Sequence, residues 1–229
     1  MAHGNMSLSQ EPRSVVLPRR EAFLRELGFD LPSAQMPHVV APVMSHSDEI
    51  RTVPHEGVWL APDCDVLVTQ GPSVLVQAIA DCLGLVIVDP VTRTIALAHA
   101  GYQGVGLDVP TKTVRYLERR FGVNPSDLLV AMGPSWQGSD GEGAWMDTRG
   151  PRLDSPRWNP YIRETGGGIV LRWVDRAYDQ LVAAGVLRER IERCPIDTYS
   201  GSDFFSHHRW VGWGKEGIDG RHLVAVGIV

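Results

Sequence analysis

Two apolar runs separated by a short turn constrain the fold of this chain more than any other feature. The runs are Leu83–Pro90 and Thr94–Ala100, and the turn lies at Asp89–Thr94. Their composition predicts two strands joined as an antiparallel hairpin. In a hairpin, the start of the first strand lies beside the end of the second. Cys82 is therefore expected close to His99.

Strand and helix patterns alternate along the rest of the chain. Further strands are predicted at 73–80, 127–135 and 221–229, and helices at 107–122 and 171–186. The segment 138–168, rich in Gly, Asp, Pro and Trp, is expected to be a long loop. Because no repeat or linker divides these pieces, residues 1–229 are predicted to form a single α/β domain around a mixed sheet, with about 1–20 as a disordered tail.

Composition excludes several classes of protein. A formal charge of −5 gives no basic surface for nucleic acid, and no apolar run approaches the roughly 20 residues that cross a membrane. The chain has only three cysteines, Cys64, Cys82 and Cys194. A small, odd number of cysteines argues against a disulfide framework. We therefore expect a soluble protein of the cytoplasm.

The proximity of Cys82 and His99 has two interpretations. A free cysteine is commonly a small core residue, and the histidine beside it would then be a buried residue with a satisfied ring. Two neighbours favour a functional site instead. Asp81 adds a carboxylate beside the cysteine, and the glycines of AGYQG after His99 allow a ligand to approach the backbone.

ADCLGLVIVDP followed by HAGYQG resembles the ADC…HAGWRG signature of the YfiH-type, or laccase-domain (multicopper polyphenol oxidoreductase), family. The resemblance continues through DCDVLVTQGP, MGPS, DRAYDQLVAAGV with Cys194, and DFFSHHR with the later Gly-Arg. These matches run in the family's order from about residue 40 to the C-terminus. The resemblance implies the YfiH-like fold, which is similar to that of cysteine amidases and deamidases.

The resemblance also implies a metal site of two histidines and one cysteine. VMSHSDEI stands where the family has Q-V-H-G, so the implied ligands are His46, Cys82 and His99. A thiolate with two imidazoles suits Zn²⁺ and leaves a fourth position open, and the same donors accept copper. The remaining histidines, His3, His38, His55 and His222, match no motif and are expected at the surface or in packing, whereas His207 and His208 replace the family's Tyr and Arg.

Departures from the family pattern bear on the substrate. In HAGYQG, Tyr102 and Gln103 replace the family's Trp and Arg, and an amide lacks the charge with which arginine binds an oxyanion. The resemblance implies Tyr102, Gln103, Ser206, Arg209 and Arg221 as residues that contact substrate, with both arginines as candidates for an anion. Phosphorolysis is therefore predicted to be weaker than chemistry that uses water.

Three reactions are compatible with these residues. The first is a zinc-dependent purine nucleoside enzyme, acting by deamination or phosphorolysis on a nucleoside with water or phosphate, with Cys82, His99 and Asp81 as catalytic residues. The second is a copper-dependent polyphenol oxidase, although one three-ligand site lacks the histidine-rich cluster that oxygen reduction requires. The third is a metal-free amidase with a Cys–His pair. A non-catalytic binding module is the remaining alternative.

The two segments that depart from the family, 136–145 and 210–219, contain Trp136, Trp145, Trp210 and Trp213. Aromatic rings stack well on planar heterocycles. At least one of these four rings is predicted to line the substrate pocket.

Overall fold

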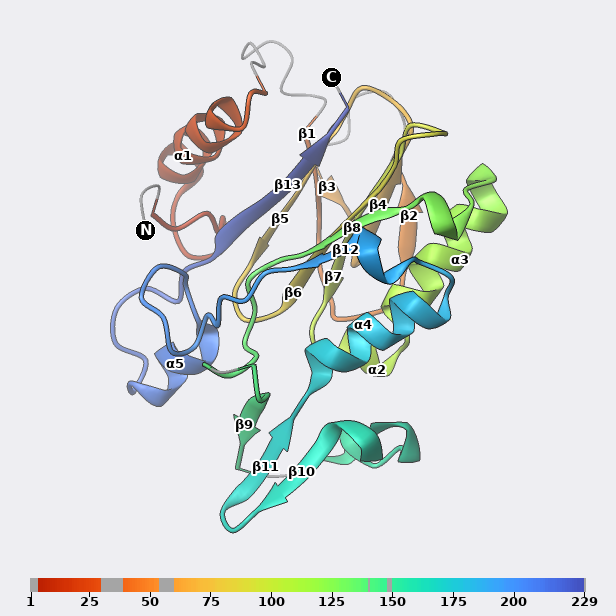
Figure 1. Ribbon diagram of the computed structural model, residues 1–229. Helices are drawn as coiled ribbons and strands as arrows, with labels where there is room; N and C mark the ends of the chain where they lie inside the picture. Colours follow the sequence, from red (N-terminus) through yellow and green to blue (C-terminus); the bar gives the residue numbers. More distant parts are fainter. Residues whose placement is uncertain (1–3, 30–38, 54–59, 140, 148–149, 229) are drawn as a thin grey trace.

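The predicted hairpin lies at the centre of the fold. In the computed structural model, which describes residues 4–29, 39–53, 60–139, 141–147 and 150–228, strands β6 (Leu83–Asp89) and β7 (Thr94–Ala100) are antiparallel. Gly84 lies opposite His99 in this pairing, so the two ends of the hairpin meet as expected. The predicted α/β class is confirmed, with more than one sheet where a single mixed sheet was expected (Figure 1).

Two sheets form the body of the domain. The larger has the order β12-β8-β6-β7-β4-β2 and the smaller the order β13-β5-β1-β3, both within the described residues. Parallel pairs occur in each sheet beside the antiparallel ones. The remaining strands of the two sheets are β1 (Val39–Pro42), β2 (Ile50–Thr52), β3 (Leu60–Ala61), β4 (Val66–Thr69), β5 (Val74–Ile79), β8 (Leu129–Met132), β12 (Ile191–Arg193) and β13 (His222–Gly227).

Helices cover the outer faces of the two sheets. Helices α2 (Tyr102–Gly106), α3 (Val109–Phe121) and α4 (Trp173–Ala183) pack on the larger sheet, and α1 (Arg13–Glu26) packs beside β5 and β13 (Figure 1). The short elements are α5 (His207–Gly212) and the 3₁₀ helices η2 (Pro125–Asp127), η3 (Pro151–Leu153), η4 (Pro156–Tyr161) and η5 (Arg188–Arg190). None of the described helices is long and apolar enough to span a membrane.

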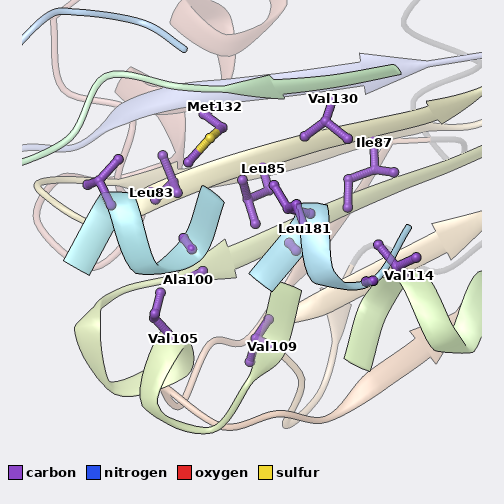
Figure 2. Packing of buried hydrophobic residues seen from close by; sticks show 14 of the residues in the cluster. Leu83, Leu85, Ile87, Ala100, Val105, Val109, Val114, Val130, Met132 and Leu181 are labelled. Carbon is purple, nitrogen blue, oxygen red and sulfur yellow. The ribbon is translucent and has the colours of Figure 1, made fainter. Parts of the chain in front are cut away.

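Alternation along the hairpin divides its side chains between two cores. Leu83, Leu85 and Ile87 pack against the helices, as Figure 2 shows. Successive side chains of a strand point to opposite faces, so His99 lies on the same face as Leu97, which packs between the two sheets. Because side chains alternate along β7 and His99 is near the end of this strand, His99 lies at the end of the space between the two sheets.

Two expectations about loops and tails were wrong. Segment 138–168 contains β9 (Ala144–Met146) and β10 (Ile162–Thr165), which form a small antiparallel sheet with β11 (Gly168–Leu171). Residues 4–20 are no tail, because Met6 is buried against the smaller sheet and its N–H donates to the Arg221 carbonyl. The glycine content of 138–168 hid the strands β9 and β10, each of which pairs with β11, and the polar N-terminal sequence hid the helix α1.

Candidate metal centre

Three side chains from separate segments meet at the end of the hairpin. Cys82 directly precedes β6, His99 is the penultimate residue of β7, and His46 comes from the connection between β1 and β2. Their ligand atoms all lie within 4.8 Å of one another. The two imidazole rings are 4.9 Å apart between centroids and nearly perpendicular. The structure thus brings together the residues that the family resemblance implied, and their role as ligands remains a prediction.

Asp65, at the start of β4, supports two of these side chains from behind. Its Oδ1 accepts the Nδ1–H of His99 at 2.7 Å and the backbone N–H of His46 at 3.1 Å. Its Oδ2 accepts the N–H and the hydroxyl of Ser47, both at 2.8 Å. A carboxylate on Nδ1 fixes the imidazole tautomer and leaves Nε2 for a metal, which is the arrangement typical of metal-bound histidine. His46, at φ 58°, occupies a left-handed turn that this carboxylate holds.

The electrostatics of the cluster favour a thiolate. Burial would raise the pKa of the Asp65 carboxyl, but hydrogen bonds from His99 and Ser47 hold it well below its usual range. Burial would also raise the pKa of Cys82, yet the adjacent His99 and His46 lower it to about 6. Burial lowers the pKa of His99, and the Cys82 thiolate and Asp65 together raise it to about 9. Without a metal, the directions of both shifts favour a thiolate beside an imidazolium.

A strained turn sets the position of Cys82. Its N–H donates to the Ala80 carbonyl at 2.8 Å, which closes a three-residue γ-turn around Asp81 at φ 69°. The Asp81 carboxylate accepts the Thr198 hydroxyl at 2.7 Å and the His208 N–H at 2.8 Å. Both carboxylate oxygens are thus engaged in fixing the backbone, and this arrangement favours a positioning role over the predicted proton transfer.

A pocket of about 400 Å³ opens in front of the cluster. Tyr102, Gln103, His207 and Arg221 line it together with the three clustered side chains. The Arg221 guanidinium is bound to Asp219, with Nη2 at 3.1 Å from Oδ2. Gln103 therefore lies on the same pocket as His99, as predicted, and the guanidinium that lines the pocket is already paired.

Two residues predicted to contact substrate lie elsewhere. Ser206 is buried and caps α5, where its hydroxyl accepts the Arg209 N–H at 3.1 Å. The Arg209 guanidinium donates to the carbonyls of Thr198, Tyr199, Gly201 and Phe204. Neither residue lines the pocket. The prediction that they contact substrate finds no support in these contacts, which are those of a loop anchor.

The expectation that a tryptophan lines the pocket is wrong for the described residues. The ring centroids of Trp136 and His208 are 4.0 Å apart, and those of Trp210 and His207 are 5.8 Å apart. These two tryptophans therefore pack against histidines that line the pocket and do not line it themselves. Trp145 lies on the small sheet, and Trp213 is 67% exposed beside Arg209.

Of the histidines expected in packing, His222 lies in β13 against Phe204, and burial lowers its pKa to about 4. His3, His38 and His55 lie outside the described residues.

Sequence reasoning missed two residues of the site. Asp65 stands in DCDVLV, a stretch whose likeness to the family was noted while the carboxylate received no role. The pairing of the following strand with β7 brings it to His99, and the sequence carries no local signal for that pairing. Gly101 was expected to let a ligand approach the backbone, and no role beside Cys82 was given to it. A Cβ there would stand 2.7 Å from Cys82 Sγ, so the glycine leaves space for the thiol.

Comparison with known proteins identifies the family of the chain. The chain matches, over residues 2–229, the family described as multi-copper polyphenol oxidoreductase laccase. The chain belongs to this family. The crystal structure of the hypothetical protein YfiH from Bacillus licheniformis superposes with a TM-score of 0.83 at 26% identity, covering 98% of this chain and 85% of that one. YlmD from Geobacillus stearothermophilus gives a TM-score of 0.81 at 27% identity, covering 97% and 84%. The predicted family and fold are confirmed.

Relatives in this family carry the name of an enzyme. The purine nucleoside phosphorylase YlmD of Geobacillus stearothermophilus is 30% identical over 175 residues, which cover 72% of this chain and 60% of that protein. A purine nucleoside phosphorylase of Streptomyces griseus is 28% identical over 209 residues, covering 83% and 74%. The alignment thus spans less than two thirds of the first relative.

Proposed function

We propose that this protein is a zinc-dependent purine nucleoside enzyme whose chemistry with water, such as deamination of adenosine, exceeds its phosphorolysis. The observation that carries the proposal is the cluster of His46, Cys82 and His99 with Asp65 behind it. The names of the relatives support a nucleoside as substrate. The donor set fits zinc: a thiolate, an imidazole with a fixed tautomer, and a second imidazole at the mouth of the pocket.

The three clustered residues would hold the metal, which when bound supplies Lewis acidity at the open side of the site. Because a ligating imidazole is neutral, binding releases the proton that His99 carries on Nε2. Asp65 then keeps Nδ1 protonated and the ring in place. Tyr102 and Gln103 border the space in which a nucleoside would lie.

The preference for water over phosphate follows from the charges that line the pocket. Gln103 brings an amide where the family motif has arginine, and Arg221 is paired with Asp219. Arg209 is saturated by carbonyls outside the pocket. The described lining therefore offers phosphate no unpaired guanidinium, whereas a neutral water molecule needs none.

Metal analysis of freshly purified protein, followed by turnover of adenosine and inosine with and without phosphate, tests the proposal. We expect about one zinc per chain, together with release of ammonia from adenosine. Cys82→Ala should abolish turnover, whereas Cys194→Ala, which alters a half-buried cysteine outside the pocket, should preserve it. A protein that binds no metal and converts no nucleoside would refute the proposal.

A second candidate is a metal-free hydrolase, and one observation favours it: the Cys82 thiol lies beside the His99 imidazole, which lowers the pKa of the thiol as in an activated nucleophile. His46→Ala separates the two candidates. The metal enzyme should lose all activity, whereas a Cys–His hydrolase should retain it. A polyphenol oxidase has less support, because within the described residues no second group of metal-binding side chains accompanies this one.

A further inference from the structure

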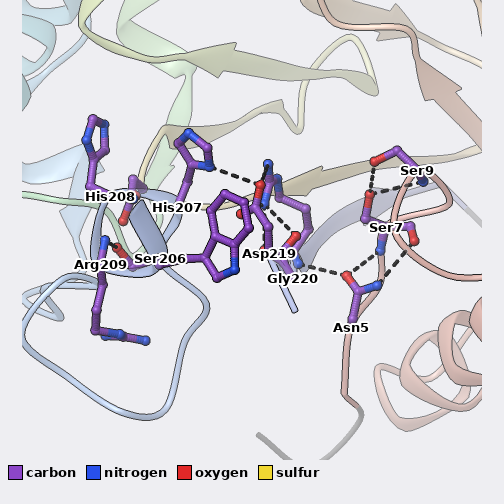
Figure 3. Close-up of polar contacts among 12 residues, drawn as sticks. Asn5, Ser7, Ser9, Ser206, His207, His208, Arg209, Asp219 and Gly220 are labelled. Atoms are coloured by element: carbon purple, nitrogen blue, oxygen red, sulfur yellow. Dashed lines mark hydrogen bonds and ion pairs between the residues drawn. The ribbon is translucent and has the colours of Figure 1, made fainter. Parts of the chain in front are cut away.

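A second histidine–carboxylate pair lines the same pocket. His207 Nδ1 lies 3.0 Å from Asp219 Oδ2 (Figure 3). Burial would raise the pKa of Asp219, but Arg221 and His207 lower it, so the side chain is an ionised acceptor. A carboxylate can only accept, and therefore Nδ1 carries the hydrogen and Nε2 is the nitrogen left for a ligand.

The pair is held rigidly. Asp219 is 8% exposed at its side chain and is bound by both terminal nitrogens of Arg221. The Arg221 N–H in turn donates to Asn5 Oδ1 at 2.9 Å. The Trp210 ring stacks on the imidazole of His207 at 5.8 Å. The orientation of His207 is thus fixed from its carboxylate side and from one ring face, while its side chain remains 44% exposed toward the pocket.

Other groups around His207 are already committed. Asp81 accepts two hydrogen bonds from the backbone and side chains around it. Burial lowers the pKa of His208, and its ring packs against Trp136. Arg221 is bound to Asp219. His207 is therefore the half-exposed imidazole of the pocket with a carboxylate behind it, the arrangement of a general acid or base.

We propose that His207 is a catalytic residue that donates the proton to the leaving nitrogen of the purine substrate, with Asp219 as its positioning residue. The proposal rests on the proposed function. In deamination, water forms a C–O bond at the purine ring and the C–N bond breaks. His207 acts in its doubly protonated form, with one proton on Nδ1 toward Asp219 and one on Nε2. The departing nitrogen keeps the bonding electron pair and takes the Nε2 proton, and the proton that water loses restores it. If the glycosidic bond breaks instead, the same proton goes to a ring nitrogen.

Substrates with leaving groups that need no proton test this role. His207→Gln keeps a polar side chain but cannot donate a proton as an acid. Its kcat/KM on adenosine should fall by roughly 10²- to 10⁴-fold, and on 6-chloropurine riboside, which loses chloride, by less than about tenfold. For glycosidic cleavage, 7-methylguanosine replaces the chloro compound. Lys215→Gln, an exposed residue just beyond α5, is the matched control and should leave both values unchanged.

Asp219→Asn provides a second variant, because an amide no longer holds Nδ1–H by charge. Like His207→Gln, it should retain more of its kcat/KM on 6-chloropurine riboside than on adenosine. Its loss of kcat/KM on adenosine should be smaller than that of His207→Gln. Both variants should bind zinc as the unmodified protein does, since the three clustered residues remain. Equal losses on the two substrates, or no loss, would overturn the acid role while the proposed function stands. An unmodified protein inactive on every nucleoside would overturn both.

Discussion

The Asp65 carboxylate is the feature of the site whose removal has the most specific consequence. Its Oδ1 accepts the His99 ring and the backbone N–H of His46, and its Oδ2 accepts Ser47 and so holds the turn that carries His46. Asp65→Asn replaces one oxygen by an NH₂ group. Whichever way the amide is turned, a donor then faces a donor, and the support of at least one of the two histidines is weakened.

The magnitude follows from the bond that is lost. A hydrogen bond to a charged group contributes about 1.5–3 kcal/mol, and each 1.4 kcal/mol is a factor of about ten in affinity. Zinc affinity should therefore fall by roughly 10- to 100-fold, the range typical for loss of a carboxylate behind a metal-bound histidine. The unpaired buried N–H should also lower the free energy of unfolding by about 1–3 kcal/mol.

Competition with a chromophoric zinc chelator measures the affinity, and thermal unfolding of chelator-treated protein measures the stability. Asp63→Asn is the matched control, because Asp63 is an exposed aspartate two residues away in a left-handed conformation that asparagine tolerates. The control should bind zinc like the unmodified protein. If Asp65→Asn also binds zinc with unchanged affinity, the carboxylate does not organise the ligands and the reasoning is wrong.

Three further predictions concern the same pocket. Gly101→Ala should force the Cys82 thiol aside, because the new Cβ would lie 2.7 Å from Sγ, and should cost about 1–3 kcal/mol in unfolding experiments; unchanged stability and zinc affinity would contradict this. In chelator-treated protein, alkylation of Cys82 by iodoacetamide should rise with pH and level off just above about 6, because its pKa is lowered and the thiolate is lost only as the pH falls through that value. Cys64, whose pKa burial raises to about 11, should remain unreactive at neutral pH, and equal rates at both thiols would refute the assignment. Gln103→Arg should raise phosphate-dependent turnover by roughly ten- to a hundredfold, whereas strong, saturable phosphate dependence in the unmodified protein would show that another cation already binds the anion.

Local patterns were sufficient for the parts of the fold in which neighbours in sequence are neighbours in space. The hairpin of β6 and β7 followed from two apolar runs and one turn, and it brought Cys82 near His99 without knowledge of any other contact. Helix α3 likewise followed from its periodicity and from Gly122, which ends it at φ 68°. The convergence of His46 came only through the resemblance to a family.

Contacts between distant segments were beyond such reasoning. Asp65 and His99 are joined by the pairing of β4 with β7, which no local pattern specifies. The pair of His207 and Asp219 depends on how the chain returns from α5 to β13. The tryptophans were misplaced for the same reason, since composition alone does not tell whether a ring lines a pocket or supports the residue that does.

The contact between Asn5 and Arg221 has a consequence for folding during synthesis on the ribosome. The two residues are 216 positions apart, and Met6 also pairs with the backbone of Arg221. A ribosome that adds about 5–20 residues per second needs on the order of ten to forty seconds to synthesise that interval. Throughout this time Met6 and Leu24 lack Leu223, their partner from β13. Part of the apolar surface of the N-terminal segment therefore stays uncovered until β13 has been synthesised, and the pocket, which Arg221 lines, is completed only then.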